Sequence, residues 1–160
     1  MTMKSKAIIA ISALAAFANV GCVSKNSEAA EKEAKEQELR LTVQLDEDIE
    51  ETRRLIKAGA DVNAQTKYGY TALMYAAGYN ASYTAQLIKA NADVNVKDDA
   101  GHTALMYAAE RDAEDVVELL IAAGADVSAK NEDGKTALML AEEHDAAEVI
   151  ALLKSAGAKE

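Results

Sequence analysis

The sequence predicts an all-α solenoid built from repeated helical units, and three observations carry this prediction. The motif Thr-Ala-Leu-Met occurs at residues 71–74, 103–106 and 136–139, with spacings of 32 and 33 residues. A second motif, Ala-x-Ala-Asp-Val, recurs in phase with the first. Ala is abundant and Pro is absent, which suits close-packed helices. Two motifs in constant phase at this spacing are typical of a stacked repeat protein.

The composition of the chain bounds its partners and its stabilising chemistry. Of its 160 residues, 17 are Lys or Arg and 27 are Asp or Glu, which gives a formal net charge of −10. This charge repels a phosphate backbone, so we expect no nucleic-acid partner. The single Cys cannot form an internal disulfide, and the hydrophobic content of 50% is enough for an apolar core.

Residues 1–21 predict a signal peptide. Lys4 and Lys6 precede an apolar run at residues 7–18, in which Ser12 is the one polar residue. A helix of this length rises about 18 Å, whereas the hydrocarbon core of a bilayer is about 30 Å thick. The run therefore favours the apolar region of a signal peptide over a permanent transmembrane helix.

The end of this segment resembles the lipobox of bacterial lipoproteins. Gly21 and Cys22 match that pattern and Val20 is acceptable, whereas Asn19 departs from it, because an aliphatic residue is usual there. The resemblance implies cleavage before Cys22 and its modification with lipid, palmitate included. The protein would then reach the membrane through a lipid anchor only. Val23, in place of Asp after the Cys, implies the outer membrane facing the periplasm.

A second processing route stays open. Ala16-Phe17-Ala18 is an A-x-A site for ordinary signal peptidase. Cleavage there would leave Cys22 as a free thiol in a soluble periplasmic or secreted protein.

Residues 22–38 predict a lipidated Cys followed by a charged spacer. Glu28 and Lys32, like Glu31 and Lys35, stand four residues apart, with Ala between them. Such pairs support a semi-rigid helical linker with a solvated charged face. The segment would hold a folded domain away from a surface.

The repeated motifs resemble the ankyrin repeat, whose signature combines Thr-Pro-Leu-His, two Ala, a Val-Val-x-Leu-Leu helix and Gly-Ala-Asp-Val-Asn. The resemblance covers residues 46–160 and implies an ankyrin-repeat solenoid of helix–turn–helix units with short β-hairpin loops. Two departures recur in this chain. Ala stands in place of Pro at residues 72, 104 and 137, and Met in place of His at residues 74, 106 and 139. Ala is a strong helix former, and Met supplies an adaptable apolar filler without the polar group of His.

Individual positions of the repeat have physical roles that the sequence predicts. Thr71, Thr103 and Thr136 precede helical periodicity and are natural N-caps. Asn91 stands where other repeats carry Gly after the second helix, at a position that needs a positive φ. Leu119 is predicted to lie in the buried seam between the helices.

We divide the repeat domain, residues 39–160, into repeats near 39–67, 68–99, 100–132 and 133–160. The first repeat lacks Thr-Ala-Leu-Met, so its opening helix stays undecided, although residues 49–57 predict a clear second helix. The second repeat is one residue shorter, and the deletion falls in the turn at residues 78–83. Atypical terminal units are expected in a stack that must cap its open ends.

The sequence contains no pattern typical of catalysis or of metal binding. His102 and His144 are the two His, and the chain offers no further residues to complete a Cys/His zinc cluster. No phosphate-binding loop and no Gly-x-Ser-x-Gly motif is present. We therefore expect a protein that is not an enzyme and needs no cofactor, with both His exposed at loops.

The resemblance implies a protein-recognition scaffold that uses its hairpin tips and inner helices as one concave surface. Seven residues at the family's variable positions are the predicted partner-binding set: Lys67, Tyr68, Tyr70, Tyr79, His102, Arg111 and Lys135. Exposed Tyr is well suited to binding hot spots. The negative charge favours a basic partner.

Four tyrosines lie in the second repeat, at residues 68, 70, 79 and 83. An alternative to binding is that they fill space around the deleted residue. Tyr75 and Tyr107 occupy an inward helical position and are expected in the core.

The leading hypothesis is a membrane-tethered protein–protein interaction module of the bacterial cell envelope. Two alternatives stay open. One is a structural stabiliser or assembly factor for an envelope complex. The other is an acidic inhibitor or immunity-type protein that masks a basic toxin or enzyme.

Overall fold

The computed structural model describes residues 26–45 and 49–159, which fall into two compact units that divide between Asp61 and Val62. The predicted signal peptide and the predicted lipidation site, Cys22, lie outside the described residues. Among the described helices, none combines the length and the apolar character that crossing a bilayer requires.

The first unit contains two helices, α2 (Asn26–Leu45) and α3 (Ile49–Lys57). The bounds of α3 are those predicted from the sequence. The opening helix that the sequence left undecided is the end of α2, which runs without interruption through the predicted boundary between spacer and repeats. Leu39 and Val43 stand four residues apart on one face of α2, and both are buried, as is Leu55 of α3.

The charged part of α2 is more than a solvated face. Lys32 lies 3.7 Å from the carboxylate of Glu36, one turn further along the helix, rather than pairing with Glu28 as the sequence suggested. It also lies 3.7 Å from the carboxylate of Asp61, and Lys35 donates a hydrogen bond to the carbonyl of Ala58. These exposed contacts are individually weak, but they link α2 to the chain that follows α3.

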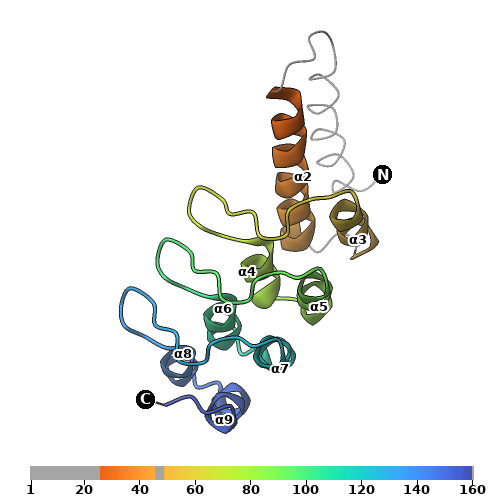
Figure 1. The fold of residues 1–160 in the computed structure, drawn as a ribbon. Coiled ribbons are helices and arrows are strands. Elements are labelled where there is room, and N and C mark those ends of the chain that lie inside the picture. The colour runs from red at the N-terminus through yellow and green to blue at the C-terminus, as the bar shows by residue number, and fades with distance from the viewer. Residues whose placement is uncertain (1–25, 46–48, 160) are drawn as a thin grey trace. The chain divides into compact units, whose positions relative to one another are not determined.

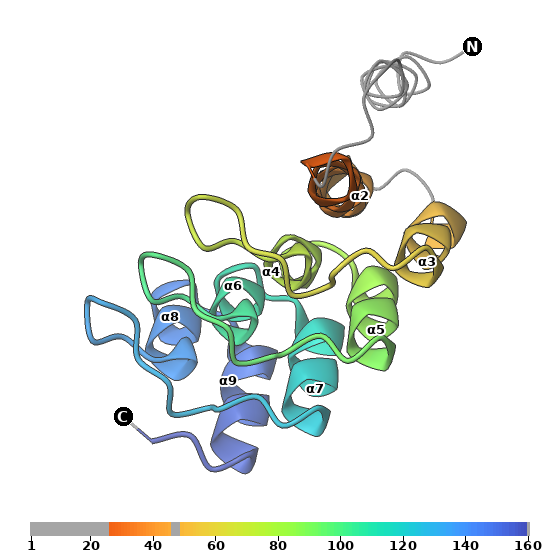
Figure 2. The same ribbon diagram turned by 45° about the horizontal axis from the view of Figure 1, so that its top comes forward.

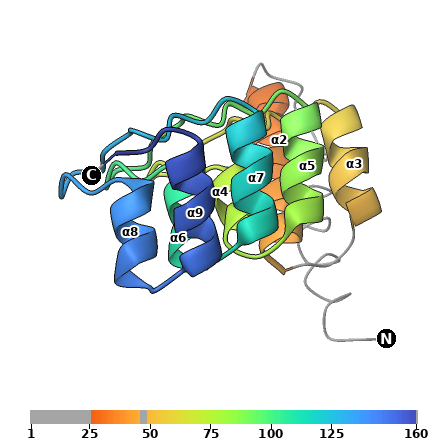
Figure 3. The same cartoon turned by 90° about the horizontal axis from the view of Figure 1, so that it is seen from below.

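The second unit consists of three successive helix pairs. These are α4 (Ala72–Ala77) with α5 (Ala81–Lys89), α6 (Ala104–Glu110) with α7 (Glu114–Ala122), and α8 (Ala137–Glu143) with α9 (Ala147–Ser155). In Figure 1, α4, α6 and α8 form one row and α5, α7 and α9 a second. The loops that precede α4, α6 and α8 project to one side of this stack (Figures 2 and 3). The predicted all-α repeat solenoid is confirmed.

Helices α4, α6 and α8, which we call the inner helices, each begin at the predicted Thr cap. The hydroxyl oxygens of Thr71, Thr103 and Thr136 accept hydrogen bonds from the backbone N–H three residues later, at 3.3–3.4 Å. In the first of these caps, the sulfur of Met74 also accepts from the N–H of Thr71, at 3.4 Å. The Met that replaces the family's His therefore keeps a polar contact here, which the sequence did not suggest.

The deletion predicted in the turn at residues 78–83 shortens the preceding helix instead, because α4 has 6 residues whereas α6 and α8 have 7 each. The turns after α6 and α8 pass through positive φ at Asp112 and Asp145, at 53° and 54°. The turn after α4 instead uses Asn80, whose side chain caps α5 by accepting from the N–H groups of Ser82 and Tyr83. Neither α7 nor α9 has a side-chain cap. The predicted positive φ of Asn91 is confirmed at 61°.

The buried seam lies one residue further along α7 than predicted. Leu120 is completely buried together with Val117, whereas Leu119 is half-buried. Leu119 lines a shallow apolar groove between α5 and α7, with Ala85 and Ile88 on its other side. The prediction for Leu119 was wrong because two adjacent Leu cannot share one face of a helix, and packing decided which one turns inward.

The projecting loops are tight turns, and no strand is assigned among the described residues. The N–H groups of Thr66, Asp98 and Asn131 donate to the carbonyls of Tyr70, His102 and Lys135, closing the three loops at 2.9–3.0 Å. Neighbouring loops are joined by further backbone hydrogen bonds, from Asp99 to Tyr68 and from Glu132 to Ala100. The loops therefore form one connected, ordered edge of the second unit.

Candidate functional site

Four aromatic rings form a continuous row across the first two helix pairs of the second unit. The ring of Tyr75 stacks on Tyr70 with centroids 5.6 Å apart. Tyr70 lies 5.8 Å from Tyr107, and Tyr107 lies 5.4 Å from His102. Tyr70 and His102 come from the loop bases, and Tyr75 and Tyr107 from the inner helices α4 and α6. All four are half-buried, so the row presents a partly solvated apolar surface. We call these residues the ring row.

A chain of hydrogen bonds holds the ring row in place. The hydroxyl of Tyr107 donates to the carboxylate of Asp98, and the hydroxyl of Tyr70 lies 3.0 Å from that of Tyr107. Asp98 is 7% exposed, and its carboxylate also accepts from the N–H groups of Ala100 and His102, at 2.9 and 2.8 Å. Burial, and then the hydrogen bonds to Asp98 and Tyr70, raise the pKa of Tyr107. The phenol therefore stays neutral and acts as a fixed donor.

His102 is less accessible than expected for a loop histidine. Its side chain is 17% exposed, and its Nε2 lies 3.6 Å from Glu110 and 3.2 Å from the amide nitrogen of Asn131. Its Nδ1 is buried and has no hydrogen-bond partner among the described residues. The expectation of an exposed His102 was wrong because its ring lies against Tyr107, Glu110 and Asn131 of the next loop. His144, at the end of α8, is exposed as expected.

The burial of three tyrosines also differs from expectation. Tyr75 and Tyr107 were expected in the core, but they belong to the ring row. The core instead takes the Ala pairs that follow them, at residues 76–77 and 108–109. Tyr83, grouped by sequence with the exposed tyrosines, is 3% exposed. The signal that could have identified the ring row is positional, because Tyr75 and Tyr107 occupy equivalent places in consecutive repeats.

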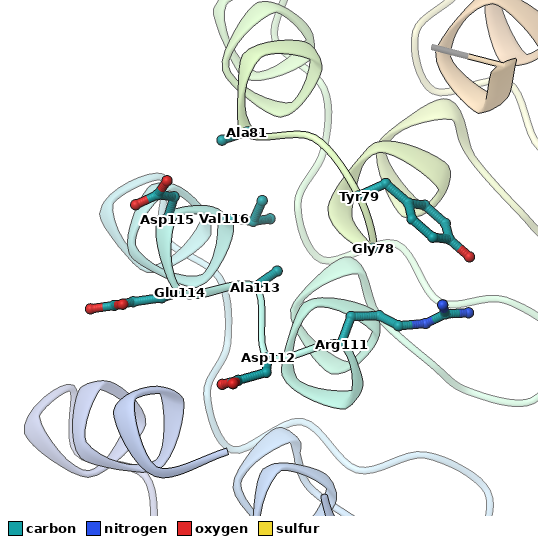
Figure 4. A pocket seen from close by; sticks show the side chains of 9 residues that line it. All are labelled: Gly78, Tyr79, Ala81, Arg111, Asp112, Ala113, Glu114, Asp115 and Val116. Atoms are coloured by element: carbon teal, nitrogen blue, oxygen red, sulfur yellow. The ribbon is translucent and has the colours of Figure 1, made fainter.

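Four other residues of the predicted partner-binding set lie outside the ring row. Tyr68 is 58% exposed at a loop tip, and Lys67 places its ammonium 4.8 Å from the ring centroid. Tyr79 is 71% exposed at the opposite end of α4, where Arg111 lies 4.8 Å from its ring centroid. Tyr79 and Arg111 line an open cleft with a volume of about 410 Å³. Figure 4 shows the side chains of Tyr79 and Arg111 extending together on one side of it. The structure therefore divides these predicted residues into separate groups: Lys67 with Tyr68, Arg111 with Tyr79, and Tyr70 with His102 through Tyr107 of the ring row.

Lys135, the last predicted residue, is engaged within its own repeat. Its ammonium lies 2.8 Å from the carboxylate of Glu143 and donates a hydrogen bond to it. This hydrogen bond is the main cause that raises the pKa of Lys135. A residue that was expected to face the partner thus forms an internal ion pair.

The arrangement of the ring row suits recognition of a partner surface. No group of three or more potential metal ligands occurs in the part of the chain that the structure describes. The ring row offers stacked aromatic surface and fixed hydroxyls, which are the features of a recognition surface.

Comparison with known proteins agrees with this conclusion. A family model for ankyrin repeats (3 copies) matches residues 14–131 and 82–160. No curated protein matches the chain. Proteins of this family are generally non-catalytic modules that bind other proteins. With most of its length covered by the family model, the chain belongs to the ankyrin-repeat family.

Proposed function

We propose that this interaction module is anchored by lipid in the bacterial envelope and binds a basic protein partner with its ring row. Protein binding follows from the family, whereas the anchor, the compartment and the partner's charge are our proposal. The observation that carries the proposed binding site is the ring row itself.

The ring row has the properties of a binding hot spot. Its rings are held by each other and by Asp98, so little side-chain entropy is lost when a partner docks. Tyrosine supplies a large contact area with few rotatable bonds. Tyr68 and Tyr79 are more exposed, but the face of each ring already lies against a cation of the same chain. We therefore centre the proposed site on Tyr70, Tyr75 and Tyr107.

The charge of the chain supports a basic partner. Removal of residues 1–21, which contain two Lys, would leave 15 Lys or Arg (17 − 2) against 27 Asp or Glu. The processed protein would carry a net charge of −12 (15 − 27). Such a field steers a basic surface toward the module and accelerates association at low salt.

The binding proposal is tested by pull-down from envelope extracts with the wild-type chain and the Tyr75→Ala variant. Loss of a central hot-spot tyrosine is expected to cost about 2 kcal/mol, roughly thirtyfold in affinity. Tyr68→Ala, at a loop tip, is the matched control and should bind normally. Melting curves of both variants establish that any loss of binding is not caused by unfolding. A partner that is retained by Tyr75→Ala and lost by Tyr68→Ala would move the site to the loop tips.

The composition of the captured material separates the alternatives. A single stoichiometric basic protein would favour an inhibitor or immunity-type role. A larger complex that co-purifies would favour a stabiliser or assembly factor.

The lipid anchor is tested by the intact mass of the membrane-bound protein. We expect a mature chain that begins at an acylated Cys22, as Gly21-Cys22 after a short apolar run suggests. Cys22→Ser should release the protein from membranes without altering its melting temperature, because Cys22 precedes every repeat. A mature chain that begins at Asn19 with a free thiol would instead establish the soluble form.

A further inference from the structure

Two equivalent residue pairs on consecutive repeats differ in one charge. Lys135 occupies in the last repeat the place that His102 occupies in the repeat before it, and Glu143 corresponds in the same way to Glu110. The later pair is closed, with 2.8 Å between the ammonium of Lys135 and the carboxylate of Glu143. The earlier pair is looser, with 3.6 Å between His102 and Glu110, and its His is charged only when protonated.

Of the two carboxylates, Glu143 is paired with a permanent cation, Lys135, and Glu110 is not. The field of Glu110 also reaches Lys135 and makes a small contribution to the raised pKa of that lysine. The hydrogen bond of Lys135, however, goes to Glu143. Arg111, next to Glu110 in the chain, stacks on Tyr79 instead. With His102 neutral, this strip of the described surface has one negative charge that no direct ion pair balances.

The surroundings of Glu110 suit a planar cation. Its side chain is 26% exposed, compared with 49% for Glu143, so water screens its charge less. Glu110 stands one helical turn after Tyr107, and His102 contacts both residues. A guanidinium can form two parallel hydrogen bonds with a carboxylate and also lie against aromatic rings, which an ammonium cannot do equally well.

We propose that Glu110 is the receptor for an arginine of the partner protein, with His102 and Tyr107 beside the guanidinium. This inference rests on the proposed function and specifies the chemistry of its partner. In the last repeat, Lys135 pairs with Glu143 and Leu140 stands in the place of Tyr107, so the structure offers one arginine position rather than two.

The test uses the isotope-labelled full chain at about pH 8, where an ordinary histidine is neutral. N-acetylarginine amide is titrated and followed by NMR, with the isosteric but uncharged N-acetylcitrulline amide as the matched probe. Arginine should give saturable shifts around Glu110 and Tyr107, and citrulline should not. Glu110→Gln should weaken the binding of arginine about tenfold or more. The matched control Glu143→Gln should leave it unchanged.

A reciprocal exchange tests the charge argument directly. His102→Lys should reproduce the closed pair of the last repeat and block the site as effectively as Glu110→Gln. Lys135→His should not create a second position of equal strength at Glu143, because Leu140 stands there in the place of Tyr107 and Glu143 is more exposed than Glu110. Circular dichroism establishes that each variant is folded.

Equal shifts with both probes, or equal losses in Glu110→Gln and Glu143→Gln, would overturn the proposal. These outcomes are distinct from failure of the proposed function. A partner captured through Tyr75 but indifferent to Glu110→Gln would leave the binding module in place and remove only the arginine receptor.

Discussion

The hydroxyl of Tyr107 and the buried carboxylate of Asp98 form a hydrogen bond that joins inner helix α6 to the loop preceding it. Two backbone N–H groups of the same loop, those of Ala100 and His102, complete the set of donors to this carboxylate. The bond thus connects the closure of the loop to the position of a ring-row residue. Stability and the proposed recognition surface depend on the same carboxylate.

Tyr107→Phe should lower the free energy of unfolding by about 1.5–3 kcal/mol, the range for a hydrogen bond to a charged group. The ring stays in place, so the loss reports the hydroxyl. Urea denaturation at neutral pH provides the measurement. Tyr75→Phe is the matched control and should be nearly neutral, because the hydroxyl of Tyr75 forms no hydrogen bond within the described part of the chain. Equal effects of the two substitutions would contradict this account of Asp98.

Stability should fall with rising pH above about pH 10, where an unperturbed tyrosine loses its proton. The raised pKa of Tyr107 means that the folded chain keeps this proton after the unfolded chain has released it. The contribution is therefore complete below pH 10 and is lost as pH rises above it, by up to about 1.4 kcal/mol per pH unit for one proton. Urea denaturation between pH 9 and 11 should show a shallower decline for Tyr107→Phe. Parallel curves would mean that Tyr107 ionises equally in both states.

Gly101→Ala should destabilise the second unit more than Gly134→Ala. Both Gly have a φ of 76°, so both substitutions introduce backbone strain. A Cβ at Gly101 would also lie 2.9 Å from the backbone nitrogen of Glu132, whereas nothing lies within 4 Å of one at Gly134. The difference between their melting temperatures measures the packing of one loop on the next. A larger loss for Gly134→Ala would show that backbone strain alone decides.

Leu120→Ala should cost about 2–5 kcal/mol, the range for truncating a buried Leu. Leu120 is completely buried, whereas its neighbour Leu119 is half-buried beside the groove between α5 and α7. Leu119→Ala should therefore cost clearly less in the same denaturation experiment. The opposite order would place the seam of α7 where the sequence first suggested.

The fold was predictable because its determinants are local and repeated. Thr103 caps α6 and Asn91 adopts a positive φ for reasons that lie within a few residues of each. Three copies of the same motifs showed how the units repeat, and the bounds of α3 followed from its own pattern. The opening helix was harder to predict, because Leu39, Leu41, Val43 and Leu45 recur every two residues, whereas Leu39 and Val43 also fit the four-residue spacing of a helix. Burial of Leu39 and Val43 on one face accompanies the helix that continues to Leu45.

The ring row depended on contacts between repeats, which no single motif encodes. The sequence by itself determined that Tyr75 and Tyr107 occupy equivalent places in consecutive repeats, that the chain is acidic, and that its last repeat carries Lys135 where the previous one carries His102. Only the tertiary structure decided that Tyr107 reaches Asp98, that Lys135 is engaged by Glu143, and that Glu110 lacks an equally close cation. The reason is physical. Helical periodicity specifies which face of a helix turns inward, but the packing of one repeat against the next decides which side chains at its margin are buried, paired or left for a partner.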